Sequence, residues 1–165
     1  MTDKSLSFAE RLILSNQLSI LKILDPEQAR YYDEAQEIVN NGYEYMYGNI
    51  NQSVYETPLP VHISEEVVEI LDMFRALEFS CRKLGVRASD LGTDFEGFDA
   101  NEADGHYGFA RFLRRKLGRW EELKDYPDNS HSSISLHRYR SMIERWHGIG
   151  RKFELSEEEV RQVVG

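Results

Sequence analysis

Apolar residues recur three and four positions apart along much of this chain, a spacing that places them on one face of an α-helix. One such stripe predicts a central core helix from about Ser64 to Leu84, and another predicts a helix that ends near His147. The first stripe consists of Val67, Ile70, Leu71, Phe74, Leu77, Cys81 and Leu84. The second consists of Leu136, Tyr139, Met142, Ile143 and Trp146. Because strict alternation of apolar and polar residues is scarce, the pattern indicates an all-α protein.

Signals for helix ends divide the chain into segments. Ser7 and Glu10 have the spacing of a capping box, in which each side chain bonds the other residue's backbone N–H. Pro26, after Asp25, suits the first position of a helix, where its missing N–H costs nothing. Further starts are expected at Ser64, Asp99 and Ser156, and stops at Gly42, Gly85 and Gly148. Together these signals predict a single all-α domain over residues 1–165, a helical bundle of roughly six or seven helices.

The first predicted helix, from Phe8 to Leu24, is apolar on nearly every face except around Asn16 and Gln17. A helix that is apolar all round needs several partners to cover it, or another subunit. We therefore expect this helix to contribute to an interface between copies of the chain. The leucines expected there are Leu12, Leu14, Leu18 and Leu21.

Composition limits the class of protein. The chain has 165 residues, of which 41% are hydrophobic and 12% aromatic, with four prolines, so we expect a globular fold rather than a disordered one. It contains no apolar run of 18 residues, and its first residues lack the order of a signal peptide. We therefore expect a cytoplasmic protein without a membrane segment. Cys81, the one cysteine, falls on the core stripe and is expected to be a buried thiol.

The net charge of −9 is unevenly distributed. Residues 111–152 include eleven basic and five acidic residues, a net charge of +6, which leaves −15 for the rest. The favoured interpretation is that the two parts neutralise each other in the fold. The alternative is a site for phosphate or nucleic acid, although the acidic remainder would repel a long polyanion. Its ligands would be Arg111, Arg114, Arg115, Arg138 and Arg140.

The stretch from Asp99 to Trp120 predicts a helix that starts at Asp99. Steps of 100° place His106, Ala110, Leu113 and Leu117 on its inner face and Arg111, Arg114 and Arg115 on its outer face. Gly105 and Gly108 share one edge, which would admit either a neighbouring helix or a ligand. The candidates for a catalytic role are His106, Tyr107 and His137. The competing interpretation makes His106 a hydrogen-bonded core histidine.

Motifs for metals and cofactors are missing from the sequence. A calcium loop starting at Asp99 fails, because position 5 is Ala103 and position 12 is Ala110. The sequence has no HExxH, GxSxG, GxGxxG or GxxxxGK[ST], so we expect no metal and no cofactor. Six tyrosines crowd into residues 31–55, which indicates either a protein interface or packing at the edge of the domain. The interface candidates among them are Tyr43, Tyr45 and Tyr47.

Several segments together resemble the YfbU family of bacterial proteins. They are "ERLILSNQ" from Glu10, "KILDP" from Lys22, "GFDANEADGHYGFARF" from Gly97, "RYRSMIERWH" from Arg138 and "LSEEEV" from Leu155. The resemblance spans nearly the whole chain and implies a small, soluble, mostly helical protein that self-assembles. It implies no activity and no catalytic residues.

These observations leave three hypotheses. The leading one is a non-enzymatic, homo-oligomeric interaction or regulatory protein, whose partner is a second copy or another protein. The second is phosphate or nucleic-acid binding through the region from Arg111 to Arg145, in a regulatory or toxin-like role. The third is an enzyme with a pocket near Gly105 and Gly108.

Overall fold

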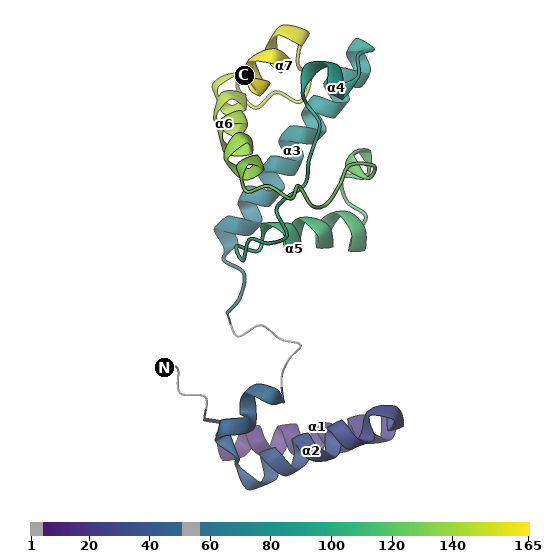
Figure 1. Ribbon diagram of the computed structural model, residues 1–165, viewed down its shortest axis with the longest axis vertical. Helices are drawn as coiled ribbons and strands as arrows, with labels where there is room; N and C mark the ends of the chain where they lie inside the picture. Colours follow the sequence, from purple (N-terminus) through teal and green to yellow (C-terminus); the bar gives the residue numbers. More distant parts are fainter. Residues whose placement is uncertain (1–4, 51–56) are drawn as a thin grey trace. The chain divides into compact units, whose positions relative to one another are not determined.

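The computed structural model describes residues 5–50 and 57–165, and the chain forms two compact units, Met1–Pro58 and Leu59–Gly165 (Figure 1). Both units are helical, and the described residues contain one isolated β-bridge but no strand. The expected all-α fold is therefore confirmed. Because the chain divides into two units, the single domain over residues 1–165 stays a prediction, and each unit is described by itself.

The first unit is a pair of helices followed by a short 3-10 segment. Helix α1, Phe8–Leu24, begins with the expected capping box, in which Ser7 and Glu10 bond each other's backbone. The 3-10 turn η1, Pro26–Gln28, leads into α2, Ala29–Asn41. Helix α2 ends at Gly42, whose φ of 67° confirms the expected stop, and η2, Glu44–Asn49, follows. Helices α1 and α2 lie side by side (Figure 1).

The core of the first unit is small. Four buried hydrophobic residues, one from α1 and three from α2, form it: Leu18, Tyr32, Ala35 and Val39. Leu14 and Ile50 pack against this cluster. A core of this size stabilises a fold weakly, so the first unit depends on few apolar contacts of its own.

The second unit is built around one long helix, α3, Val61–Leu84 (Figure 1). It begins after Pro60, three residues before the expected start at Ser64, and ends as expected at Gly85, where φ is 71°. Four other α-helices and one 3-10 turn contact it. The remaining elements are α4, Ala88–Leu91; α5, His106–Arg111; η3, Phe112–Lys116; η4, Glu121–Leu123; α6, Ile134–Gly148; and α7, Glu157–Val164.

The apolar stripes predicted from the sequence form the core of this unit. Phe74 on α3 contacts Phe95 and Tyr139 with ring centroids 5.0 and 4.9 Å apart, in edge-to-face geometry. Cys81 is buried as expected, and burial raises the pKa of its thiol, which makes the thiolate scarce. The two tryptophans of the chain, Trp120 and Trp146, are also buried here.

The expected helix start at Asp99 is wrong, because the helix begins at His106. The Asp99 carboxylate accepts the backbone N–H of Asn101 at 2.9 Å, a local turn that competes with helix formation. Gly105 then has φ of 90°, outside the helical region, and Asp104 accepts the N–H of His106 at 3.1 Å. Residues 99–105 therefore form a loop, and Gly105 lies outside the helix.

The expected outward position of Arg114 is also wrong. Residues Phe112–Lys116 form a π-helical turn, η3, in which each turn holds more residues than an α-helix, so a constant step of 100° no longer applies. Arg114 is turned inward and Leu117 outward, whereas His106, Ala110 and Leu113 are buried as expected. The π-turn thus buries the charged side chain of Arg114 and exposes the apolar side chain of Leu117.

Candidate functional site

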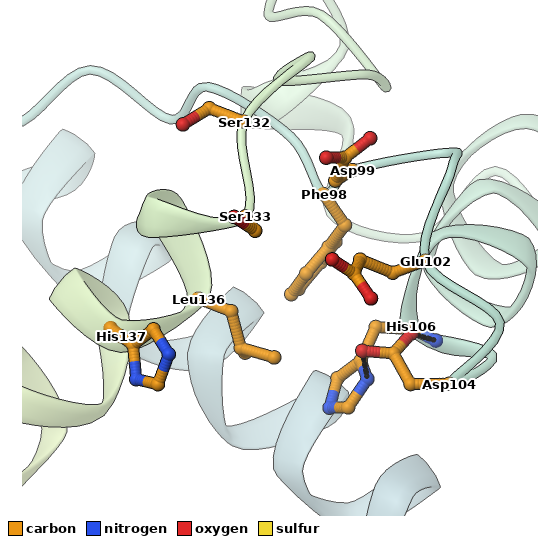
Figure 2. Close-up of a pocket in the computed structure, with 9 residues that line it drawn as sticks. All are labelled: Phe98, Asp99, Glu102, Asp104, His106, Ser132, Ser133, Leu136 and His137. Carbon is orange, nitrogen blue, oxygen red and sulfur yellow. Dashed lines mark hydrogen bonds and ion pairs between the residues drawn. The ribbon is translucent and has the colours of Figure 1, made fainter.

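Two of the candidate catalytic residues, His106 and His137, line the same cavity of about 150 Å³. Figure 2 shows His106 and three carboxylates on one side, and Ser133, Leu136 and His137 at the start of α6 on the other. The carboxylates are those of Asp99, Glu102 and Asp104. Tyr107 is not among the residues that line this cavity. The fold therefore brings together two of the three predicted residues.

His106 is 2% exposed, and both of its ring nitrogens face carboxylates. Nε2 lies 2.7 Å from Oε2 of Glu66, and Nδ1 lies 2.9 Å from Oδ2 of Asp104. Arg140 binds the same Glu66 through two contacts of 2.6 and 2.9 Å. Nε2 is hydrogen-bonded to Glu66, whereas the buried Nδ1 lies beside Asp104 without hydrogen-bond geometry to any described residue. A ring buried in this way is oriented but poorly placed to exchange a proton with a ligand. The geometry therefore supports a core histidine more than a general base.

Charge pairing also fixes the protonation of Glu66. The hydrogen bonds from the Arg140 guanidinium, reinforced by that of His106, lower the pKa of Glu66 to about 2, against the opposing effect of burial. The ionised carboxylate thus links α3, α5 and α6 across ordinary pH values.

Replacing Glu66 by glutamine should remove an acid-sensitive part of the stability. Since the pKa in the folded state lies below the ordinary value of 4.5, the wild-type contribution is present above pH 4.5 and disappears as pH falls toward 2. We expect E66Q to be less stable at pH 7 and to lose less stability on acidification, as measured by urea denaturation between pH 7 and 3. The neighbouring exposed Glu65→Gln is the control, and equal acid profiles of E66Q and the wild type would contradict the assignment.

The edge that carries Gly105 and Gly108 does not form a ligand site around both glycines. A Cβ on Gly105 would lie 2.3 Å from Cδ1 of Leu59, so an apolar side chain already fills this space. Gly108 has no atom within 4 Å of the corresponding position. Neither glycine lines the cavity at His106. The close approach that Gly105 permits is therefore made by Leu59, whereas the space beside Gly108 is open.

Most of the candidate phosphate-binding arginines contact acidic side chains of the protein. Arg115 binds both oxygens of Asp128, at 2.8 and 3.0 Å, and Arg138 lies 3.2 Å from Glu96. Arg140 binds Glu66, as described above, and Arg114 also contacts Asp128, at 2.8 Å. Arg111 is exposed. These pairs support internal neutralisation over an anion-binding site.

Most of the exposed large apolar residues in the described part of the first unit lie on α1. Its outward side exposes Ile13 by 56%, Ile20 by 57% and Ile23 by 78%. The other exposed large apolar residues of α1 are Phe8, Leu12, Leu21 and Leu24. Leu14 and Leu18, which the sequence places among the interface candidates, pack toward α2 instead.

Sequence reasoning missed the regularity of this outward side. Ala9, Ile13, Asn16, Ile20 and Ile23 follow one another at steps of four, three, four and three residues, the spacing of a coiled-coil seam. All five are exposed in the first unit. The alternating four- and three-residue spacing was the signal that could have identified this side. It is hard to recognise in a helix whose other faces also carry apolar residues.

The tyrosine-rich segment divides between surface and core. Tyr45 is 98% exposed and Tyr43 about half exposed, whereas Tyr47 is buried within the first unit. Tyr31 donates its hydroxyl to the carbonyl oxygen of Ile50 at 2.9 Å. Tyr55 lies outside the described residues. Among the described tyrosines of the segment, Tyr31, Tyr43 and Tyr45 are exposed, whereas Tyr32 and Tyr47 are buried.

The described residues are also informative about a membrane segment and a metal site. None of their helices is long and apolar enough to cross a bilayer. They also contain no group of three or more histidine, cysteine, aspartate or glutamate side chains placed to hold a metal ion.

Comparison with known families gives one match that extends over both units. The family model described as the YfbU domain matches residues 4–165. This range includes α1 and its outward side together with the whole of the second unit.

Proposed function

The chain belongs to the YfbU family, and we propose that it is a cytoplasmic, non-enzymatic interaction protein that forms homo-oligomers through the outward side of α1. The observation that supports this proposal is the exposure of large apolar side chains along the whole of that helix. Contiguous apolar surface of this kind marks interaction sites in proteins.

The energetics favour association. Full burial of a large aliphatic side chain stabilises by about 1.5–3 kcal/mol, and α1 exposes seven such apolar residues by 41% or more. Their combined burial is sufficient to offset the loss of translational and rotational freedom, about 4–15 kcal/mol. The described part of the first unit buries five hydrophobic residues, the four of the core cluster and Tyr47, so a contact on α1 would also add to the stability of that unit.

Placing charges on the outward side should dissociate the oligomer. We expect Ile13→Asp combined with Ile20→Asp to weaken association by about 100-fold or more, because a desolvated carboxylate without a partner costs several kcal/mol. Light scattering across a concentration series measures the change. The matched control is Asn40→Asp with Asn49→Asp, which adds the same charge at exposed positions of the first unit. A wild-type chain that stays monomeric at high concentration would contradict the proposal.

A further inference from the structure

One polar side chain interrupts the outward stripe of α1 at its centre. Asn16 lies between Ile13 and Ile20 on the exposed side, and eight residues of the helix precede it and eight follow it. We infer that α1 packs against α1 of a second copy about a two-fold axis at Asn16, an inference that rests on the proposed oligomerisation. In this arrangement the two Asn16 carboxamides hydrogen-bond each other across the axis.

The chemistry of asparagine suits this position. A carboxamide carries both a donor NH₂ and an acceptor oxygen, so two copies facing each other satisfy one another. Covered by an apolar partner instead, the Asn16 amide would lose its hydrogen bonds to water without replacement. A single asparagine in an apolar seam also selects register and number of chains in coiled coils, because only aligned copies pair their amides.

The symmetry of the helix agrees with a contact between identical surfaces. Since Asn16 is the midpoint of Phe8–Leu24, a two-fold axis beside it and perpendicular to two antiparallel helices overlaps them along their full length. Such an isologous contact closes at two copies and leaves no part of the stripe uncovered. A contact centred on Ile13 or Ile20 would leave one end of each helix exposed.

Charge favours a second copy over an anionic surface. The positions that flank the stripe are uncharged apart from Glu10, which is held in the capping box with Ser7. The described residues of the first unit include seven acidic and three basic residues, so an anionic membrane or a nucleic acid would be repelled.

Self-association keeps the acidic helices apart. Helix α2 packs against the side of α1 that carries Leu14 and Leu18, opposite to the stripe. The two α2 helices of a dimer would therefore be separated by three interaxial distances of about 8–10 Å each. This separation exceeds the Debye length of about 8 Å at physiological ionic strength.

The available surface matches the scale of a dimer contact. Burying a large apolar side chain removes roughly 60–120 Å² of surface from water, as its stabilisation of about 1.5–3 kcal/mol at about 25 cal/mol per Å² implies. At the exposed fractions found on α1, its seven large apolar residues together expose several hundred Å² of apolar surface. One side of a standard interface buries about 800 Å².

Cross-linking through position 16 tests the axis. In the full chain, Asn16→Cys should form a disulfide-linked dimer under mild oxidation with diamide, seen on a non-reducing gel, because the two side chains meet at the axis. The wild type controls for Cys81, which is buried, and Glu34→Cys on the exposed side of α2 controls for random collision. Light scattering on the reduced proteins is measured in parallel.

The outcomes separate this inference from the proposed function. A dimer that cross-links at position 16 at least ten times faster than at position 34 supports the axis. A dimer that cross-links no faster at position 16 overturns the axis but leaves oligomerisation standing, whereas a monomer overturns both. As a second readout, Asn16→Leu should associate at least tenfold more tightly. It should also form a mixture of oligomers instead of one species of defined mass, because no polar pair then selects the register of the helices. Unchanged mass and affinity in that variant would also overturn the pairing of the carboxamides.

Discussion

Replacing Arg114 by methionine is expected to lower the free energy of unfolding by about 3–5 kcal/mol, the cost of removing one partner from a buried charged pair. The Arg114 side chain is 1% exposed and packs over the ring of Phe95, with its guanidinium carbon 4.9 Å from the ring centroid. Burial lowers the pKa of this guanidinium, and the charge of Asp128 opposes that effect.

The contacts of Arg114 explain why the loss should be large. Its guanidinium donates to the backbone carbonyl oxygens of Leu123, Tyr126 and Pro127, at 2.6, 2.8 and 3.0 Å, and to Asp128 at 2.8 Å. Methionine would fill much of the space but donate to none of these acceptors, and the Pro127 carbonyl oxygen would lose the bond from Arg114. The segment that joins η4 to α6 would keep its bonds to Arg115 but lose those to Arg114.

Thermal denaturation followed by circular dichroism measures the effect. For a unit of about 100 residues, 3 kcal/mol corresponds to a decrease in Tm of about 12 °C or more. The control is Arg111→Met, three residues earlier at an exposed position, where we expect a change within about 0.5 kcal/mol. Similar losses in the two variants would show that the contacts of Arg114 contribute little.

Replacing Gly97 by alanine should destabilise the second unit by about 2–4 kcal/mol, through backbone strain and a steric clash together. Gly97 has φ of 84°, and a Cβ there would lie 2.3 Å from the carbonyl oxygen of Asp128. The clash would separate two segments that are joined by the bonds from Phe98 N–H to Asp128 and from Ser130 N–H to Phe98.

Gly118 provides a control that separates the two causes. Its φ of 63° strains an alanine in the same way, but nothing lies within 4 Å of the position of a Cβ. We expect Gly118→Ala to cost about 1 kcal/mol, the lower end of the range for a strained residue. Chemical denaturation of both variants gives the difference, and a loss at Gly97 no greater than at Gly118 would rule out the steric contribution.

Much of the fold could be predicted because the signals are local. The capping boxes at Ser7 and Ser156 and the stops at Gly42 and Gly85 depend on neighbours within a few residues, and all four are present. The core stripe on α3 was also predictable, since an amphipathic helix has one apolar face to bury.

The parts that could not be predicted depend on contacts between distant segments. The π-turn at Phe112–Lys116 is associated with the buried Arg114, whose acceptors lie 9–14 residues further along the chain. The space beside Gly105 is filled by Leu59, which no spacing rule connects to it. On α1, the sequence does not tell which apolar face packs on α2, so the outward isoleucines could not be distinguished from the inward leucines.

The location of the indoles has a practical consequence. Both tryptophans of the chain, Trp120 and Trp146, are buried in the second unit, and the first unit has none. Selective excitation at long ultraviolet wavelengths therefore reports on the second unit alone, whereas an ellipticity signal averages the helices of both. If the two optical signals change at different denaturant concentrations, the units unfold in separate steps. The unfolding curve of each unit can then be measured in one unlabelled sample.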